Sequence, residues 1–234
     1  GAVWQPLFIM YGDFRTGIQT FDNGPVESTE WVNRLNLFGN LYLTPTERFL
    51  FHVRPLNRDG EFTGYRFSGD DDDGGFESFN IQVQSAFFEG DLGEMFPNWD
   101  LDDKKNLDIG FSIGRQPLVF QDGIILNDFV DSIGITRASL FRFGSNASHV
   151  TAYFGLNQLH RDDNLRDSDA LLYGINIAAD YDKSTYEFDV AYVDGDALTG
   201  GDGLYAGIGQ TRRFGHFNST IRYNLSLLHI SEPT

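Results

Sequence analysis

The chain has 234 residues, no cysteine, and 17 Lys and Arg against 34 Asp and Glu, for a formal net charge of -17. This negative charge excludes nucleic acid as a partner, because phosphate binding requires a cationic surface. The lack of cysteine excludes disulfides and thiolate metal sites. No stretch approaches the roughly 18 consecutive apolar residues of a membrane-spanning helix, and the length suits one all-β domain.

Apolar and polar residues are finely interleaved along the chain. Aromatic residues make up 15% of it, yet the mean hydropathy is only -0.30. In the stretch 79–84 (FNIQVQ) large apolar residues alternate with amides. Alternation of this kind is typical of β-strands, and membrane-spanning barrel strands need apolar residues only at every second position.

Period-two alternation predicts about eleven strands and no helix. In chain order they are expected at 7–21, 29–43, 48–56, 76–89, 107–115, 131–140, 148–156, 170–181, 185–194, 204–214 and 217–226. The eighth of these shows the two faces, with Tyr173, Ile175 and Ile177 on one side and Asn176 and Asp180 on the other. The first face suits lipid and the second suits water.

Long and short connections tend to alternate between the predicted strands. Long ones are expected at 57–75, 116–130, 157–169 and 195–203, short ones at 44–47, 141–147, 182–184 and 215–216, and two at 22–28 and 90–106 depart from the alternation. Outer-membrane barrels have short periplasmic turns and long outer loops. Tyr181 with Tyr186, and Phe214 with Phe217, bracket two of the short turns, as aromatic girdles do.

These patterns predict an antiparallel up-and-down transmembrane β-barrel of the bacterial outer membrane over residues 1–226. The last ten residues, 225–234, resemble a translated sequencing-adapter tail, and 227–234 are expected to be non-native. Because bacterial barrels have an even number of strands, eleven strands predict an incomplete barrel and hence a fragment of a larger one. A secreted, carbohydrate-binding β-sandwich is the alternative fold and function.

Two short motifs resemble a known family. The stretch 12–15 (GDFR), and 113–117 (IGRQP) leading into 121–123 (QDG), resemble the alginate-export type of Gram-negative outer-membrane porin. The resemblance implies a monomeric barrel with a charged lumen that passes anionic polysaccharide or other hydrophilic solutes. By position, Asp13, Arg15 and Arg115 would be lumen residues. The position two after the early Arg, commonly basic in that family, is Gly17 here, which argues against alginate itself.

The face assigned to water carries charges of both signs. Charged side chains lining a pore set its selectivity, and opposed acidic and basic patches would orient polar solutes. The alternative is that these residues only line the hydrated interior of the barrel and form salt bridges with each other, without a role in selectivity. The candidate pore-lining and substrate-binding residues are Asp13, Arg15, Arg34, His52, Arg54, Gln82, Gln84, Arg115, Glu187, Asp189, Arg222 and Asn224.

One cation falls on the apolar parity of its strand. Arg212 shares that parity with Leu204 and Ile208, and an arginine facing lipid near the midplane costs about 2–4 kcal/mol. It is expected to reach the periplasmic rim, unless a bulge near Gly209 reverses the register. The orientation of Arg137 stays open.

Metal binding and catalysis are not favoured. Asp70 to Asp73 could offer oxygen ligands to calcium, but a solvated acidic loop is the simpler interpretation, and 194–196 and 201–203 are interpreted as turns. Five histidines lie outside known nucleophile or zinc spacings. Only His149 with Ser148 or Ser132 can be named for a hydrolase, the least favoured function.

The sequence thus predicts a channel that is not an enzyme, needs neither cofactor nor metal, and contacts membrane lipid and lipopolysaccharide. It is expected to work as a monomer and to pass hydrophilic solutes or anionic polysaccharide by passive diffusion.

Overall fold

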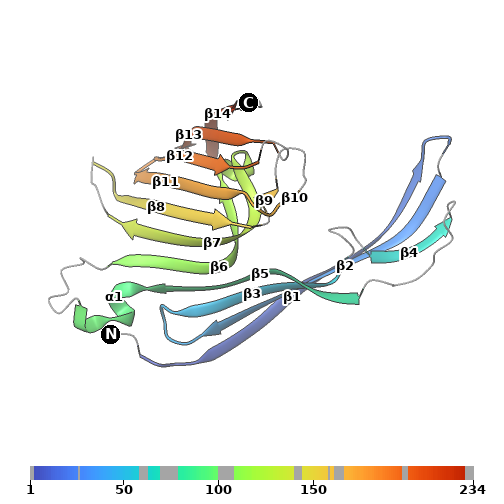
Figure 1. Ribbon diagram of the computed structural model, residues 1–234, viewed down its shortest axis with the longest axis horizontal. Coiled ribbons are helices and arrows are strands. Elements are labelled where there is room, and N and C mark those ends of the chain that lie inside the picture. Colours follow the sequence, from blue (N-terminus) through green and yellow to red (C-terminus); the bar gives the residue numbers. More distant parts are fainter. Residues whose placement is uncertain are drawn as a thin grey trace.

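The computed structural model describes residues 3–25, 27–57, 63–68, 79–99, 108–139, 144–157, 159–160, 166–196 and 200–229. Within them the chain is all-β, as predicted, with one dominant antiparallel sheet (Figure 1). The strands are β1 (Leu7–Asp22), β2 (Glu27–Tyr42), β3 (Arg48–Leu56), β4 (Thr63–Ser68), β5 (Phe79–Asp91), β6 (Ile109–Phe120), β7 (Leu126–Ala138), β8 (Ala147–Leu156), β9 (Leu159–His160), β10 (Arg166–Asp167), β11 (Leu171–Tyr181), β12 (Ser184–Asp194), β13 (Asp202–Phe214) and β14 (Phe217–His229). The helical elements described are α1 (Leu92–Met95), η1 (Pro97–Trp99) and η2 (Gln121–Gly123). No helix in this part of the chain is long and apolar enough to cross a bilayer.

The sheet is an up-and-down meander. Its order is β1-β2-β3-β5-β6-β7-β8-β11-β12-β13-β14, while β4 pairs with β2, and β9 and β10 form a separate two-stranded sheet. The eleven strands of this path correspond one to one to the predicted strands, whereas β4, β9 and β10 were not predicted. The edges are β1 and β14, and no pairing between them is present in the described residues. The sheet is therefore open in the described residues; an incomplete barrel was expected, and a transmembrane barrel stays a prediction.

The predicted long connection at 116–130 is wrong in its bounds. β6 continues to Phe120 and β7 begins at Leu126, with Pro117 opposite Phe129 in an unbroken register. Proline is tolerated because the pairing of β6 with β5 ends at Arg115. Beyond that point β6 has a partner on one side only, which is the edge position that proline tolerates in a sheet.

The connections lie at two ends of the sheet. At the short-turn end are 43–47, 92–108, 139–146, 182–183 and 215–216, and at the long-loop end are 23–26, 57–78, 121–125, 157–170 and 195–201. Two connections do not follow the alternation of long and short, as the sequence already indicated. At the long-loop end 23–26 is short, and at the short-turn end 92–108 is long and carries α1 and η1. The remaining connections sort as the sequence predicted, apart from the shortened 121–125.

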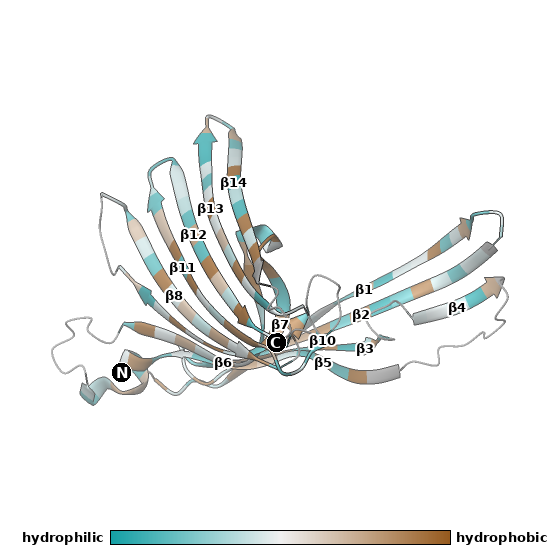
Figure 2. Ribbon diagram, turned by 45° about the horizontal axis from the view of Figure 1, so that its top comes forward, coloured by the Kyte–Doolittle hydropathy of each residue, from teal (hydrophilic) through white to brown (hydrophobic). Residues whose placement is uncertain are grey.

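The two faces of the sheet differ sharply in exposure and polarity. In β7, Val130 and Ser132 are 0% and 3% exposed, while Ile133 and Ile135 are 43% and 49% exposed. We call the face that carries Ser132 and Asp189 the inner face, and the opposite one the outer face. Figure 2 shows the resulting hydrophilic and hydrophobic bands alternating along the strands from β8 to β14.

A small apolar core lies on the inner face near the long-loop end. Connections 121–125 and 157–170 contribute to it, because Ile125 packs against it and Leu159 and Ala170 are buried within it. Its buried members are Leu118, Val130, Tyr153, Leu159, Ala170, Leu172, Ala191 and Val193. Beyond this core the inner face carries polar side chains such as Gln116 and Asn176, and also apolar ones such as Phe38 and Leu50.

Candidate functional site

The first polar group of the inner face lies on β1, β2 and β3. Nε of Arg15 lies 2.9 Å from Oδ1 of Asp13, and Nδ2 of Asn36 donates to both oxygens of Asp13 at 3.1 Å. Oδ1 of Asn36 in turn accepts from Nε of Arg54 at 3.1 Å and lies 3.1 Å from Nε2 of His52. Four of the candidate residues named from the sequence are thus brought together around one asparagine.

A third arginine completes what we call the arginine cluster (Arg15, Arg34 and Arg54). Arg34 is the register partner of Arg15 across the β1–β2 ladder, and Arg54 lies within electrostatic reach of both. Asp13 pairs with Arg15 and lies within electrostatic reach of Arg54. The cluster therefore gathers three cations on the inner face of a chain whose formal net charge is -17.

His52 is held by rings on two sides. Its imidazole stacks on Phe38 at a centroid distance of 4.2 Å, and Phe129 of β7 lies 6.1 Å away. The second contact joins β3 to β7, which are not neighbours in the sheet, so the sheet must bend beyond the point where β5 stops pairing with β6. Phe129 has the parity of the exposed Ile133 and not that of the inner face. This packing leaves His52 buried.

A second polar group surrounds Asp189 of β12. Its side chain has no exposed surface, and its carboxylate accepts from Nε2 of Gln121 at 2.6 Å and from Nδ2 of Asn176 at 2.7 Å. A buried carboxylate is tolerated only when hydrogen-bonded. Because Gln121 follows β6 while Asp189 lies on β12, this contact also requires a curled sheet.

Arg222 of β14 links the connection between β6 and β7 (121–125) to the inner face of the sheet. Its Nη1 lies 2.6 Å from Oδ2 of Asp122, and its Nη2 lies 3.4 Å from Oε2 of Glu187. Gln121 and Asp122 both lie in the left-handed region of the backbone, with φ of 52° and 53°. Residues other than glycine rarely adopt this conformation. Such strain persists where surrounding contacts fix it.

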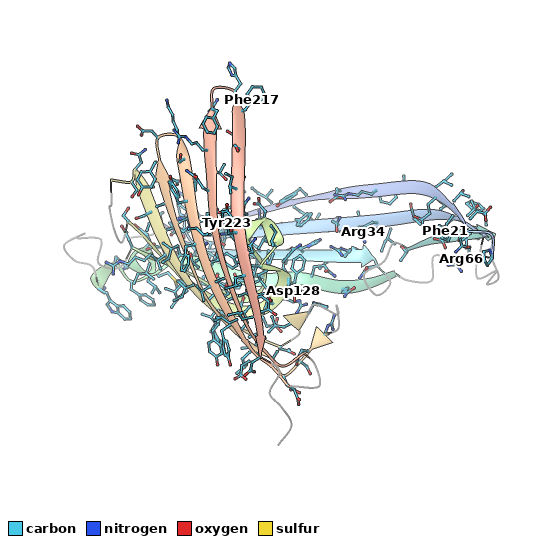
Figure 3. The ribbon with its side chains drawn as sticks, turned by 90° about the horizontal axis from the view of Figure 1, so that it is seen from above. Phe21, Arg34, Arg66, Asp128, Phe217 and Tyr223 are labelled. Atoms are coloured by element: carbon cyan, nitrogen blue, oxygen red, sulfur yellow. The ribbon has the colours of Figure 1, made fainter. Side chains whose placement is uncertain are left out.

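Two glycines of β13 make room for this connection. A β-carbon at Gly207 would fall 2.5 Å from Cδ1 of Ile125, and one at Gly209 would fall 2.9 Å from Oε1 of Gln121. We call the group of Gln121, Asp122, Asn176, Glu187, Asp189 and Arg222 the latch, because it fixes connection 121–125 against the inner face. Figure 3 draws the side chains of β13 and β14 as sticks and labels Phe217 and Tyr223 of β14.

The remaining candidate residues lie elsewhere. Gln82 is the register partner of Arg54 and accepts from Asn57, and the β3–β5 register shifts next to Gln84. Arg115 shares the parity of the exposed Ile113 and pairs with Asp131 at 3.6 Å. It therefore has the outer parity near the long-loop end, where its Nε also donates to the backbone oxygen of Gln84 at 3.2 Å.

The latch contains residues that sequence reasoning missed. Gln121 and Asp122 were noted as part of a motif but placed in a long outer loop, and Asn176 was seen only as a polar strand position. The signal that could have found the latch is the pair Gly207 and Gly209, which leaves two successive inner positions of β13 without side chains.

Aromatic side chains gather at both ends of the outer face. At the short-turn end, Tyr181 and Tyr186 are in edge contact at 5.6 Å. At the long-loop end, Tyr173 lies 5.1 Å from Phe154 and 6.4 Å from Tyr192. We call these the lower and upper aromatic rows.

Arg212 lies at the short-turn end of the outer face, its guanidinium 5.2 Å from the centroid of Phe214. The register of β13 with both neighbours is continuous through Gly209, so the alternative of a bulge there is wrong. Arg137 shares the parity of Ile133 and Ile135 and so also belongs to the outer face.

The residues considered for catalysis are not brought together. Ser132 is opposite Gly155, six positions along β8 from His149, which corresponds to about 20 Å along a strand. Ser148, next to His149, faces away from it because neighbouring strand residues point to opposite faces. Asp70 to Asp73 lie outside the described residues. Asp202 and Gly203 belong to β13, so the turn predicted at 201–203 is wrong there; Oδ1 of Asp202 accepts from the backbone N–H of Gly195 at 3.2 Å, across the connection between β12 and β13.

No protein-family model and no curated protein matches this chain.

Proposed function

We propose that this chain forms the wall of an outer-membrane channel through which hydrophilic solutes, anionic ones among them, diffuse passively. In this proposal the outer face contacts lipid and lipopolysaccharide, the inner face lines the aqueous path, and no cofactor takes part. The observation that carries it is the inverted distribution of polarity between the exposed and the buried face.

Among the described residues, 14 polar or charged side chains are buried against 9 apolar ones. Large apolar residues stand exposed on the outer face of strand after strand, as with Ile175 at 47%, Phe188 at 43% and Ile208 at 53%. Soluble proteins rarely expose contiguous apolar patches above a few hundred Å². A face of this kind suits a hydrocarbon surrounding, where barrels place apolar residues outward and polar ones inward.

The spacing of the two aromatic rows supports the same surrounding. Tyr173 and Tyr181 are eight residues apart on β11, or about 26 Å at 3.3 Å per residue. With strands tilted by about 40°, the rows are separated by roughly 20 Å along the membrane normal, close to the apolar band of about 25 Å in outer-membrane barrels. Tyrosines at both limits of that band match the girdles of such proteins.

The arginine cluster favours anionic solutes at one place along the path. Three guanidinium groups gather on the inner face of β1 to β3. Rings and patches of arginine select for anions in pores. The proposal therefore assigns anion selectivity to Arg15, Arg34 and Arg54.

A membrane wall also requires paired edges. The unpaired backbone groups of β1 and β14 would each cost several kcal/mol in hydrocarbon. The proposal therefore includes pairing of both edges in the membrane, with each other or with further strands.

An arginine scan of the outer face tests the proposal. Phe188 and Tyr186 are each 43% exposed on β12, so a soluble sheet would tolerate arginine equally at both. In a membrane, Phe188→Arg is expected to lower the free energy of unfolding by at least about 2 kcal/mol and Tyr186→Arg by less than about 1 kcal/mol, because the cost depends on depth.

Urea unfolding from lipid vesicles measures both values. Equal losses for the two variants would contradict the membrane assignment. Heat-modifiable migration of membrane-extracted protein is the independent check, and a β-sandwich would instead appear in the soluble fraction without such a shift.

A further inference from the structure

We propose that the inner face between β5 and β8 carries a subsite for an uncharged sugar ring. It is a cavity of about 370 Å³, lined by residues of β5, β6, β7 and β8 and of the turn before β3. Small-molecule sites usually occupy about 300–1,000 Å³, so this cavity suits one small solute. The inference rests on the proposed channel only for the route by which the solute arrives.

Glycine forms the floor of this sugar subsite. Gly110 of β6 is opposite Thr136, and Gly134 of β7 is opposite Ser112. A β-carbon at Gly110 would meet no atom closer than 3.8 Å, so glycine is not required there by packing. Glycine inside a strand often marks a place where a ligand approaches the backbone closely.

Two stacked rings bound the subsite towards the long-loop end. Phe120 and Tyr153 lie 4.7 Å apart at an interplanar angle of 9°, and both line the cavity. Pockets for small solutes combine such apolar surface with a few placed polar groups. The apolar C–H face of a sugar ring is the part of a hydrophilic solute that can use this surface.

Hydroxyl and amide groups supply the polar part. The hydroxyls of Thr136 and Thr151 lie 2.8 Å apart on neighbouring strands, and Ser112 and Gln116 line the same cavity. A hydroxyl both donates and accepts hydrogen bonds, which matches the hydroxyl groups of a sugar. Sites built to bond a hydroxyl discriminate strongly against ligands that lack it, because the site's polar groups are then left unpaired.

The charge of the subsite excludes anions. Glu89 and Asp91 line it on the β5 side. Arg48 pairs with Glu89, and Asp91 accepts from the backbone N–H groups of Gly93 and Glu94 at 2.8 and 3.1 Å. Two carboxylates against one guanidinium leave a negative surplus. The sugar it takes is therefore uncharged, in contrast to the anions expected at the arginine cluster.

Saturation-transfer NMR on the full chain in detergent micelles tests this without any bilayer. Methyl β-D-glucoside is expected to bind, and D-glucuronate to bind at least tenfold more weakly. Equal or tighter binding of glucuronate, or no binding of the glucoside, would overturn the subsite.

Two variants locate the binding. Thr136→Val is expected to weaken glucoside binding at least fivefold, while Thr211→Val, which alters the equivalent hydroxyl pair with Thr220 (3.0 Å) away from the cavity, leaves it unchanged. Gly110→Val places a side chain in the open space of the cavity without a clash and is expected to abolish glucoside binding. Unchanged binding in Thr136→Val and Gly110→Val would also overturn the subsite.

The two proposals fail separately. Glucoside binding without any ion conductance in bilayers would contradict the channel alone. Conductance without glucoside binding would contradict the subsite alone.

Discussion

The ring of Tyr153 lies over Gly174 of the neighbouring strand, so closely that a β-carbon at position 174 would fall 2.0 Å from Cζ of the tyrosine. The two residues are register partners in β8 and β11. The ring therefore crosses the adjacent strand, where the missing side chain leaves a place for it, and it stacks there on Phe120 of β6. One glycine thus allows three strands to be joined through a pair of rings.

Gly174→Ala is expected to lower the free energy of unfolding by about 1–3 kcal/mol, the usual cost of overpacking, because Tyr153 must leave its place. Urea unfolding in micelles measures it. Gly17→Ala is the matched control, since a β-carbon added at Gly17 would have no atom within 4 Å, and it should change stability by less than about 0.5 kcal/mol. Equal stability of the two variants would contradict the packing described for Tyr153.

Asp189→Ala is expected to lower the free energy of unfolding by at least about 2 kcal/mol, because it leaves two buried amide donors, on Gln121 and Asn176, without an acceptor at a cost of about 1–3 kcal/mol each. Asp182→Ala removes a carboxylate that accepts from Asn146 in an exposed turn and should cost less than about 0.5 kcal/mol. Denaturant unfolding of both variants measures these free energies. A decrease in the free energy of unfolding as large for Asp182→Ala as for Asp189→Ala would refute the role of burial.

Arg222→Met keeps the apolar stem and removes the charge that ties Asp122 and Glu187 together. Hydrogen bonds to charged groups contribute about 1.5–3 kcal/mol, so the amides of 121–125 are expected to exchange at least about tenfold faster. Hydrogen-exchange mass spectrometry measures this protection. Arg213→Met is the control, because Nε of Arg213 donates only to the backbone oxygen of Gly215 in an exposed turn. No change in Arg222→Met would show that the latch does not depend on its ion pairs.

Arg34→Ala combined with Arg54→Ala removes two of the three positive charges of the arginine cluster. In planar bilayers the permeability ratio of chloride to potassium is expected to fall, because selectivity follows the charge that lines the path. The reversal potential in a salt gradient reports the ratio directly. Arg213→Ala, a change of one exposed charge at the short-turn end, should leave it unaltered. An unchanged permeability ratio in the double variant would show that the arginine cluster does not determine ion selectivity.

The strands could be predicted because polarity alternates strictly along them. In β11 and β12 the outward parity is apolar at almost every position, so their bounds fall within a residue of the prediction. The bounds of the connection predicted at 116–130 were wrong, since β6 and β7 continue pairing with each other beyond the point where β5 stops pairing with β6. Arg115 was misplaced for a different reason: the motif suggested the lumen, while the shared parity with Ile113 already indicated the other face.

The latch could not be predicted, because it depends on curvature. Gln121 and Asp189 are 68 positions apart in the chain, and parity specifies the face of each side chain but not how far the sheet curls. The arginine cluster was easier to find, since β1, β2 and β3 are consecutive in the chain and their register alone brings its members together.

The meander also determines the order in which contacts can form. In the main sheet each strand pairs with the strand that comes before it in the chain, apart from the short strands β4, β9 and β10. Each pairing therefore closes only a modest loop, and the entropic cost of closing a loop rises slowly with its length. Local pairing of this kind allows the sheet to grow hairpin by hairpin. The contact between Gln121 and Asp189 has no such local route, because β6, β7, β8, β11 and β12 must all be in place first. We therefore expect it to form late in folding, and its rate would report the curling of the sheet separately from the pairing of its strands.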